Sequence, residues 1–219
     1  PSQELAEQYD NVYLFLDELN SAPPSVQATA YQLILNRRVG QYILPDNVCI
    51  AAAGNRDTDK GVVYRMPSPL ANRFFHLEVE VNHEDWQTWA VENDINPDVV
   101  GYLAFAKQDL FDFDPKSSSR SFATPRSWAF VSQMLEDSDM SHDEEMDIVT
   151  GLVGEGMAIK FMNHKKNASK LPKPSEILSG KVKELKKLEI SSKYALTVGM
   201  SYELKGIQDS GDEKELTAS

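Results

Sequence analysis

The first third of this chain alternates between strand-like and helix-like spacing of its apolar residues. Residues 12–16 and 48–53 are continuous apolar runs, a pattern typical of parallel strands that are buried on both faces of a sheet. Between them, Pro23 and Pro24 precede apolar residues at helical spacing, and proline favours the first turn of a helix. The pattern predicts an α/β fold in which a parallel sheet carries flanking helices.

The remainder of the chain has mostly helical spacing. One more strand is expected at residues 76–81, where apolar and polar residues alternate as they do in an edge strand. Helices are expected after it, and the Thr124-Pro125 pair predicts a helix start, because threonine caps a helix and proline suits its first turn. Further helices are expected at about residues 176–189 and 192–204.

These patterns divide the chain into three segments. Residues 1–82 are predicted to form part of an α/β core, residues 83–165 a helical domain, and residues 166–219 a lysine-rich helical extension with a polar tail. The apolar runs fall far below the about 18 residues needed to cross a bilayer, so no membrane span is expected. Cys49 lies in one of these runs and is interpreted as a small hydrophobic residue. As the only cysteine it excludes an internal disulfide, which suggests a reducing, cytoplasmic compartment.

Charge is distributed unevenly along the chain. The 219 residues hold 34 acidic and 22 basic side chains, a net charge of −12, which argues against a protein built mainly to grip nucleic acid. Residues 160–193 nevertheless contain ten lysines against three glutamates, a local charge of +7. This stretch is either a solvated helical surface or a docking patch for an acidic partner.

Polar side chains follow both buried runs at the point where each predicted strand ends. Asp17 and Glu18 follow the first run, and Asn55 follows the second. In open parallel sheets this edge is where ligands bind. One carboxylate could hold a hydrated magnesium ion that bridges to phosphates, while the other polarises an attacking water that Asn55 helps to hold. The alternative interpretation is a pair of solvated strand-end turns.

Two arginines are further candidates. Arg73 precedes Phe74 and Phe75, so it either stacks on an aromatic ring at the surface or is presented to the phosphates of a neighbouring subunit. Arg126 follows Pro125 at a predicted helix start. It either snorkels at the surface or reaches a phosphate from a second domain.

Several of these segments together resemble the MoxR-type branch of the AAA+ ATPases. The string Asp-Glu-Leu-Asn-x-Ala-Pro-Pro at residues 17–24 precedes a predicted helix that ends in Arg-Arg-Val-Gly at residues 37–40. The strings at residues 53–55, 70–74 and 123–126 follow in the order and spacing that this family has. The likeness covers residues 12–128, and the remainder resembles the extended lid regions of such ATPases, including some in bacteriophage.

The resemblance implies a P-loop AAA+ parallel sheet followed by an α-helical lid, with ATP and Mg²⁺ as cofactors. It implies that Asp17 is the Walker B aspartate that orients magnesium and that Glu18 is the catalytic glutamate that activates water. Asn55 would be the sensor 1 residue, Arg73 the arginine finger for a neighbour's site, and Arg126 the sensor 2 arginine. Proteins of this family assemble as homo-oligomeric rings, usually hexameric, and use ATP hydrolysis to remodel a client protein in a chaperone-like way.

One family feature is missing from the sequence. The phosphate-cradling Walker A loop, Gly-x-x-x-x-Gly-Lys-Ser/Thr, does not occur in these 219 residues. Because the chain begins with Pro1 rather than methionine, we expect it to be part of a longer protein and to be inactive alone. Two alternatives stay open: a non-catalytic AAA+-like module for assembly or docking, and an ATPase that remodels nucleic acid through its lysine patch.

Overall fold

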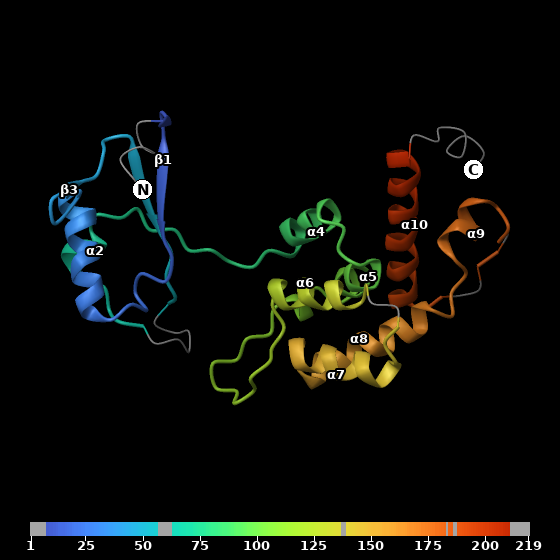
Figure 1. The fold of residues 1–219 in the computed structure, drawn as a ribbon. Helices are drawn as coiled ribbons and strands as arrows, with labels where there is room; N and C mark the ends of the chain where they lie inside the picture. The colour runs from blue at the N-terminus through green and yellow to red at the C-terminus, as the bar shows by residue number, and fades with distance from the viewer. Residues whose placement is uncertain (1–7, 57–62, 137–138, 183, 186–187, 211–219) are drawn as a thin grey trace. The chain divides into compact units, whose positions relative to one another are not determined.

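The computed structural model describes residues 8–56, 63–136, 139–182, 184–185 and 188–210. The chain divides into two compact units, Pro1–Val79 and Glu80–Ser219, which can be followed in Figure 1. The predicted boundary after residue 82 lies three residues from this division. A small parallel sheet in the first unit, together with the helices of both units, confirms the predicted α/β class.

The first unit is built on two parallel strands. Strand β1 (Val12–Leu16) pairs with β4 (Val48–Ala52) in a register that sets Leu16 opposite Ala52. Helix α2 (Pro24–Asn36) connects them and begins, as predicted, at the two prolines. A hairpin of β2 (Arg38–Val39) and β3 (Tyr42–Ile43) follows the helix. Both strand predictions and the helix between them are confirmed.

Arg37 joins the end of α2 to the start of β4. Its backbone is left-handed, with φ +51°, and this conformation ends the helix. Its Nη2 atom donates hydrogen bonds to the carbonyl oxygens of Pro45 at 2.6 Å and Val48 at 2.8 Å. Because a guanidinium offers five donors in a fixed plane, one side chain can satisfy two carbonyls that precede and begin the strand.

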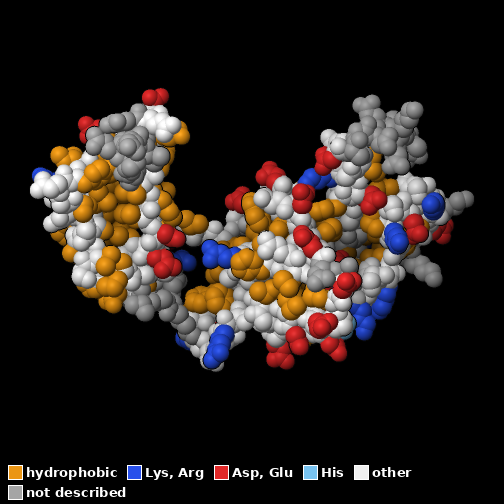
Figure 2. All heavy atoms as spheres, in the orientation of Figure 1, with side chains coloured by type: hydrophobic (Ala, Val, Ile, Leu, Met, Phe, Trp, Pro, Cys, Tyr) orange, Lys and Arg blue, Asp and Glu red, His pale blue; other side chains and the backbone are white. Residues whose placement is uncertain are grey.

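The expected burial of both sheet faces is wrong. Val12, Val48 and the nearby Leu44 form a small core, against which Leu33 of α2 packs. Tyr13 on the opposite face is 75% exposed, and its neighbours Phe15, Cys49 and Ala51 are exposed as well. Within the described residues α2 packs against one face only, so the strands show a one-sided burial pattern. Figure 2 shows that hydrophobic side chains reach the surface of this unit.

The strand predicted at residues 76–81 is also wrong. After the short helix α3 (Ser68–Ala71), the backbone is extended, but the described part of the chain gives it no strand partner. Phe75, Leu77 and Val79 are between 75% and 88% exposed. Alternation in the sequence indicates which residues could share a face, but a strand also needs a neighbour that accepts its backbone hydrogen bonds.

The second unit is helical, as predicted. Its elements are α4 (His83–Glu92), α5 (Pro97–Phe105), the 3₁₀ helix η1 (Lys107–Leu110), α6 (Pro125–Met134), α7 (His142–Val153), α8 (Glu155–Ala168), α9 (Pro174–Leu178) and α10 (Ile190–Ser210). Four of the described helices start at side-chain caps, in which Asn82, Asn96, Thr124 and Ser141 accept backbone hydrogen bonds of the first turn. The predicted helix start at Thr124-Pro125 is therefore confirmed.

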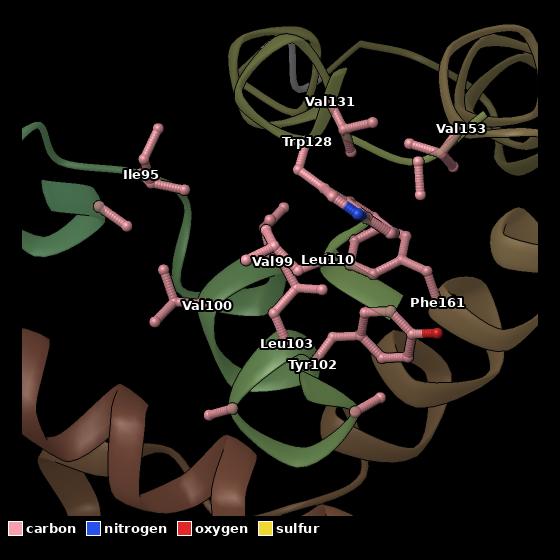
Figure 3. Close-up of a cluster of buried hydrophobic side chains, with 14 of the residues drawn as sticks. Ile95, Val99, Val100, Tyr102, Leu103, Leu110, Trp128, Val131, Val153 and Phe161 are labelled. Carbon is pink, nitrogen blue, oxygen red and sulfur yellow. The ribbon is translucent and has the colours of Figure 1, made fainter. Parts of the chain in front are cut away.

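Aromatic side chains form the centre of this unit. The indole of Trp128 and the ring of Phe161 are fully buried, with their centroids 5.6 Å apart, and Tyr102 packs against both (Figure 3). Trp86 is buried at the edge of the same cluster, whereas Trp89 is 43% exposed. Burial of large aromatic area is the main source of stability for such a bundle.

The segment after residue 165 differs from expectation in one respect. Helix α10 confirms the helix predicted at 192–204 and packs directly against α5. The lysine-rich helix predicted at 176–189 is wrong, because α9 ends at Leu178 and Gly180 takes a φ of +70°. Residues 183, 186 and 187 lie outside the described part of the chain. Among the described helices, none has the length and apolar character needed to cross a bilayer.

Candidate functional site

The carboxyl ends of β1 and β4 lie side by side, and they carry the predicted polar residues. Backbone pairing continues past the strands: the N–H of Ala53 donates to the carbonyl of Leu16 at 2.9 Å, and the N–H of Leu19 donates to Ala53 at 3.0 Å. The turn that holds Asp17 and Glu18 therefore runs next to the segment that leads to Asn55. The structure brings these three predicted residues to one edge of the sheet.

Glu18 has an unusual backbone conformation. Its φ is +52°, a left-handed value that costs a non-glycine residue about 1–2 kcal/mol. The turn around it compensates: the N–H of Glu18 donates to Asp17 Oδ1 at 3.0 Å, and the N–H of Ser21 donates to the carbonyl of Glu18 at 2.9 Å. Both carboxylates remain exposed. Backbone strain of this kind clusters at functional sites, where surrounding contacts hold it in place.

Asn20 links the two strand ends through its side-chain amide. Its Nδ2 atom donates to the carbonyl of Asn55 at 2.7 Å, and its Oδ1 atom accepts from the N–H of Asn55 at 3.1 Å. The sequence contains Asn20 and Gly54 within the family-like strings, but residue types alone did not identify them as partners. The signal in the sequence is an amide three residues after Asp17 together with a glycine just before Asn55.

A cavity of about 470 Å³ opens beside this pair. Its walls combine the strand ends with the segment that follows the undescribed residues 57–62. Its lining residues are Leu19, Asn20, Ala52, Ala53, Gly54, Asn55, Tyr64, Arg65, Met66, Ala71, Phe74, Phe75, His76 and Leu77. Asn55 thus borders a space large enough for a bound group, and the lining includes both polar and aromatic side chains.

Arg73 is not part of this cluster. It is exposed just after α3, and its Nη1 atom donates to the carbonyl of Pro69 at 2.9 Å, one turn back along the chain. Among the described residues it makes no ion pair with Asp17 or Glu18 and does not line the cavity.

Arg126 belongs to the second unit. It is the second residue of α6, and it is exposed. The helix start is fixed by a capping box in which the Thr124 side chain accepts from the N–H of Ser127, whose hydroxyl accepts from the N–H of Thr124. This rigid first turn presents the guanidinium to solvent.

The donor set at the sheet edge is suited to magnesium rather than to a protein-enclosed metal. Within the described residues no three His, Cys, Asp or Glu side chains gather as a metal site. Mg²⁺ typically takes only one or two carboxylates and completes its shell with water and phosphate oxygens. The exposed carboxylates of Asp17 and Glu18 fit that requirement.

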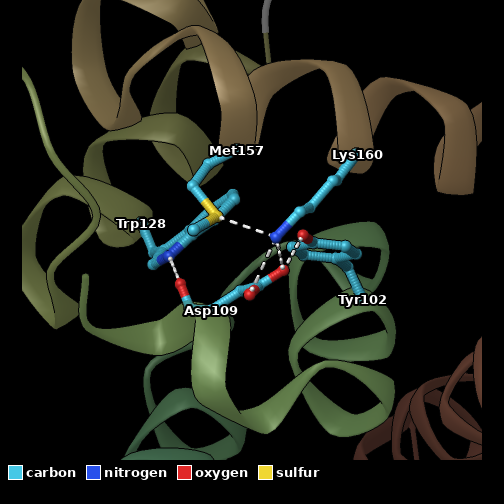
Figure 4. A network of polar contacts seen from close by, with 5 residues as sticks. All are labelled: Tyr102, Asp109, Trp128, Met157 and Lys160. Atoms are coloured by element: carbon cyan, nitrogen blue, oxygen red, sulfur yellow. Dashed lines mark hydrogen bonds and ion pairs between the residues drawn. The ribbon is translucent and has the colours of Figure 1, made fainter.

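A second polar cluster, which the sequence did not reveal, lies in the second unit. Asp109 is 3% exposed and accepts a hydrogen bond from the Tyr102 hydroxyl, while Lys160 Nζ lies 3.3 Å from each of its carboxylate oxygens (Figure 4). The backbone carbonyl of Asp109 accepts from Trp128 Nε1 at 2.9 Å. Burial and the hydrogen bond to Asp109 raise the pKa of Tyr102 well above its ordinary value. The cluster ties η1 to α5, α6 and α8.

Comparisons with protein-family models, with curated proteins and with solved structures found no match. The chemistry of this molecule is therefore inferred from its own residues.

Proposed function

We propose that this chain is the Walker B to sensor 2 portion of a MoxR-like AAA+ ATPase, which hydrolyses ATP in an oligomeric ring and remodels a client protein. The observation that carries the proposal is the in-register parallel pairing of β1 with β4. It sets the Asp17–Glu18 turn beside Asn55 at the carboxyl edge of the sheet, where ligands bind in open parallel sheets.

Each residue of this edge has a distinct role in the proposal. Asp17 holds Mg²⁺, which when bound neutralises charge on the phosphates. Glu18 accepts a proton from the attacking water, and its exposed carboxylate is free of ion pairs within the described chain. Asn55 offers an amide that orients this water or a γ-phosphate oxygen.

The two arginines act from outside this edge. The exposed position of Arg73, whose guanidinium bonds one turn back to the Pro69 carbonyl, supports a role at the site of a neighbouring subunit. Arg126, in the capped first turn of α6, supports a contact from the helical unit. An arginine supplied by a neighbour stabilises transition-state charge in phosphoryl transfer and couples hydrolysis to assembly.

The phosphate cradle is the part that these 219 residues do not supply. No Gly-x-x-x-x-Gly-Lys-Ser/Thr occurs in the sequence, so in this proposal the backbone amides that bind the β- and γ-phosphates come from another segment of the complete gene product. The proposal therefore applies to that product.

Phosphate release from Mg·ATP by the complete gene product tests the proposal. Glu18→Gln keeps the size of the side chain and removes its basicity, so we expect kcat to fall by about 10²–10⁴-fold. Asp46→Asn is the matched control, because Asp46 is exposed before the amino end of β4, at the opposite edge of the sheet, and should turn over ATP like the wild type. Wild-type turnover by Glu18→Gln would remove the role assigned to Glu18. A complete gene product that binds no ATP would instead support a non-catalytic module.

A further inference from the structure

We infer that Asn20 is a positioning residue, which holds the Asn55 segment in place against the Asp17–Glu18 turn. The inference rests on the proposed ATPase function, and it adds a residue to which the family-like motifs assign no role. The contact spans 35 residues of sequence and joins the end of β1 to the end of β4.

The geometry of the contact is specific for an asparagine. One side-chain amide donates from Nδ2 to the Asn55 carbonyl and accepts at Oδ1 from the Asn55 N–H, so it satisfies both backbone groups of a single residue. An aspartate would set a second acceptor against the carbonyl oxygen. An alanine would leave both backbone groups without this partner. The backbone of Asn55 is thus fixed by a side chain rather than by a strand neighbour.

The backbone carbonyl of Asn20 is itself held by hydrogen bonds. Its carbonyl accepts from the N–H of Tyr64 at 2.8 Å. Gln27, a buried residue of α2, donates from Nε2 to the carbonyl of Ala22 at 2.8 Å and to that of Asn20 at 3.5 Å. The Tyr31 hydroxyl in turn donates to Gln27 Oε1 at 3.0 Å. We call the two hydrogen bonds between the Asn20 side chain and the Asn55 backbone the clamp. The contacts with Gln27 and Tyr64 fix Asn20 against helix α2 and the Tyr64 segment, so the clamp can hold Asn55 in one position.

Gly54 is the size-matched partner of this clamp. A Cβ atom added at Gly54 would lie 2.4 Å from Asn20 Oδ1 and 2.8 Å from Asn20 Cγ. The nearest three atoms all belong to the Asn20 side chain, and the φ of Gly54 is not left-handed. Close approach, rather than backbone conformation, therefore requires glycine here. Gly54→Ala should displace Asn20 and open the clamp.

Loss of the clamp should affect the chemical step more than nucleotide binding. Asn55 is proposed to orient the attacking water or the γ-phosphate, and a displacement of about 1 Å at such a group costs up to about 10²-fold in rate. We therefore expect Asn20→Ala to lower kcat by about 10–100-fold with little change in the KM for ATP. Since Asn20 acts through Asn55, its loss should cost nothing further once the Asn55 side chain has been removed.

The experiment is a set of mutant cycles on the complete gene product, with kcat and KM for ATP measured for each variant. Asn20→Ala and Asn55→Ala should each lower kcat, and the double variant should match Asn55→Ala. Gly54→Ala should lower kcat as well, and Asn20→Ala/Gly54→Ala should be no slower than Asn20→Ala. Asn11→Ala is the matched control, because Asn11 is exposed before the amino end of β1, and its kcat should stay at the wild-type value.

Two outcomes overturn the inference: a wild-type kcat for Asn20→Ala, or losses at Asn20 and Asn55 that multiply in the double variant. Thermal unfolding of the same variants provides a readout without ATP, in which the Gly54→Ala penalty should shrink in the Asn20→Ala background. If Gly54→Ala lowers the Tm by the same amount in the Asn20→Ala background as in the wild type, the inference is also overturned. A wild-type product that hydrolyses no ATP overturns the proposed function, whereas an active wild type with an unaffected Asn20→Ala overturns only the positioning role.

Discussion

Removal of the Asp109 carboxylate should destabilise the second unit through the partner that it leaves behind. Asp109 and Tyr102 are 3% and 2% exposed, and the Tyr102 hydroxyl donates to the carboxylate. In Asp109→Ala this hydroxyl loses its acceptor while it stays buried. Lys160 also loses its ion pair, but its side chain is 55% exposed and can be hydrated. Loss of the acceptor for Tyr102 should therefore lower the free energy of unfolding more than loss of the ion pair with Lys160.

The expected magnitude follows from these exposures. An orphaned buried hydroxyl costs about 1–3 kcal/mol, and an ion pair with one exposed partner contributes at most about 1 kcal/mol. Asp109→Ala should thus lower the free energy of unfolding by about 1–4 kcal/mol. Adding Tyr102→Phe removes the orphaned hydroxyl, so the double variant should be more stable than the sum of the single effects by about 1–2 kcal/mol.

Urea denaturation followed by tryptophan fluorescence measures this coupling. All three tryptophans, Trp86, Trp89 and Trp128, belong to the second unit, so the signal reports on that unit. A double-mutant cycle over Asp109 and Tyr102 should give a clearly non-zero coupling energy. Effects that add to within about 0.5 kcal/mol would refute the buried hydrogen bond as a source of stability.

Two further predictions concern the same unit. Burial lowers the pKa of His164, so the neutral ring is favoured in the folded state and stability is lost as the pH falls below about 6.5. His164→Phe keeps the ring contacts with Phe105 and Tyr102 and should reduce the fall in Tm between pH 7.5 and 5.5. An unchanged fall in Tm would contradict this role of His164. Gly101→Ala would bring a Cβ to 3.2 Å from the Ala195 Cα of α10 and should lower the free energy of unfolding, measured by urea denaturation, by about 1–3 kcal/mol. Gly151→Ala, which has open space around it, should instead stabilise α7 by about 0.5–1 kcal/mol. Equal effects of the two changes would rule out close packing of α5 on α10.

Local signals in the sequence were sufficient for much of the fold. The apolar runs at 12–16 and 48–53, the prolines that open α2 and the Thr124 cap all specify elements through nearby residues, and each was found where it was predicted. The edge that holds Asp17 and Asn55 followed from the same pattern, because parallel strands bring their carboxyl ends together.

Features that depend on distant partners were not predictable in this way. The pattern at 76–81 is that of a strand, yet the described chain offers no neighbour for it. Tyr13 and Cys49 lie in apolar runs that suggest a sheet buried on both faces, but both side chains are exposed. Burial of a sheet face depends on whether another element packs against it, which the run itself does not encode. The hydrogen bond between Asn20 and Asn55 spans 35 residues of sequence, and the one between Trp128 and Asp109 joins residues that belong to no recognisable motif.

Single turnover of bound ATP measures whether Glu18 activates water for ATP hydrolysis, as we propose. Wild type and Glu18→Gln of the complete gene product are loaded with Mg·ATP, the bound fraction is measured by calorimetry, and ADP formation is followed after rapid quenching. If Glu18 has this role, both proteins bind ATP in a magnesium-dependent way and Glu18→Gln forms ADP at least about 100-fold more slowly. Equal rates of ADP formation in the two proteins would contradict this role.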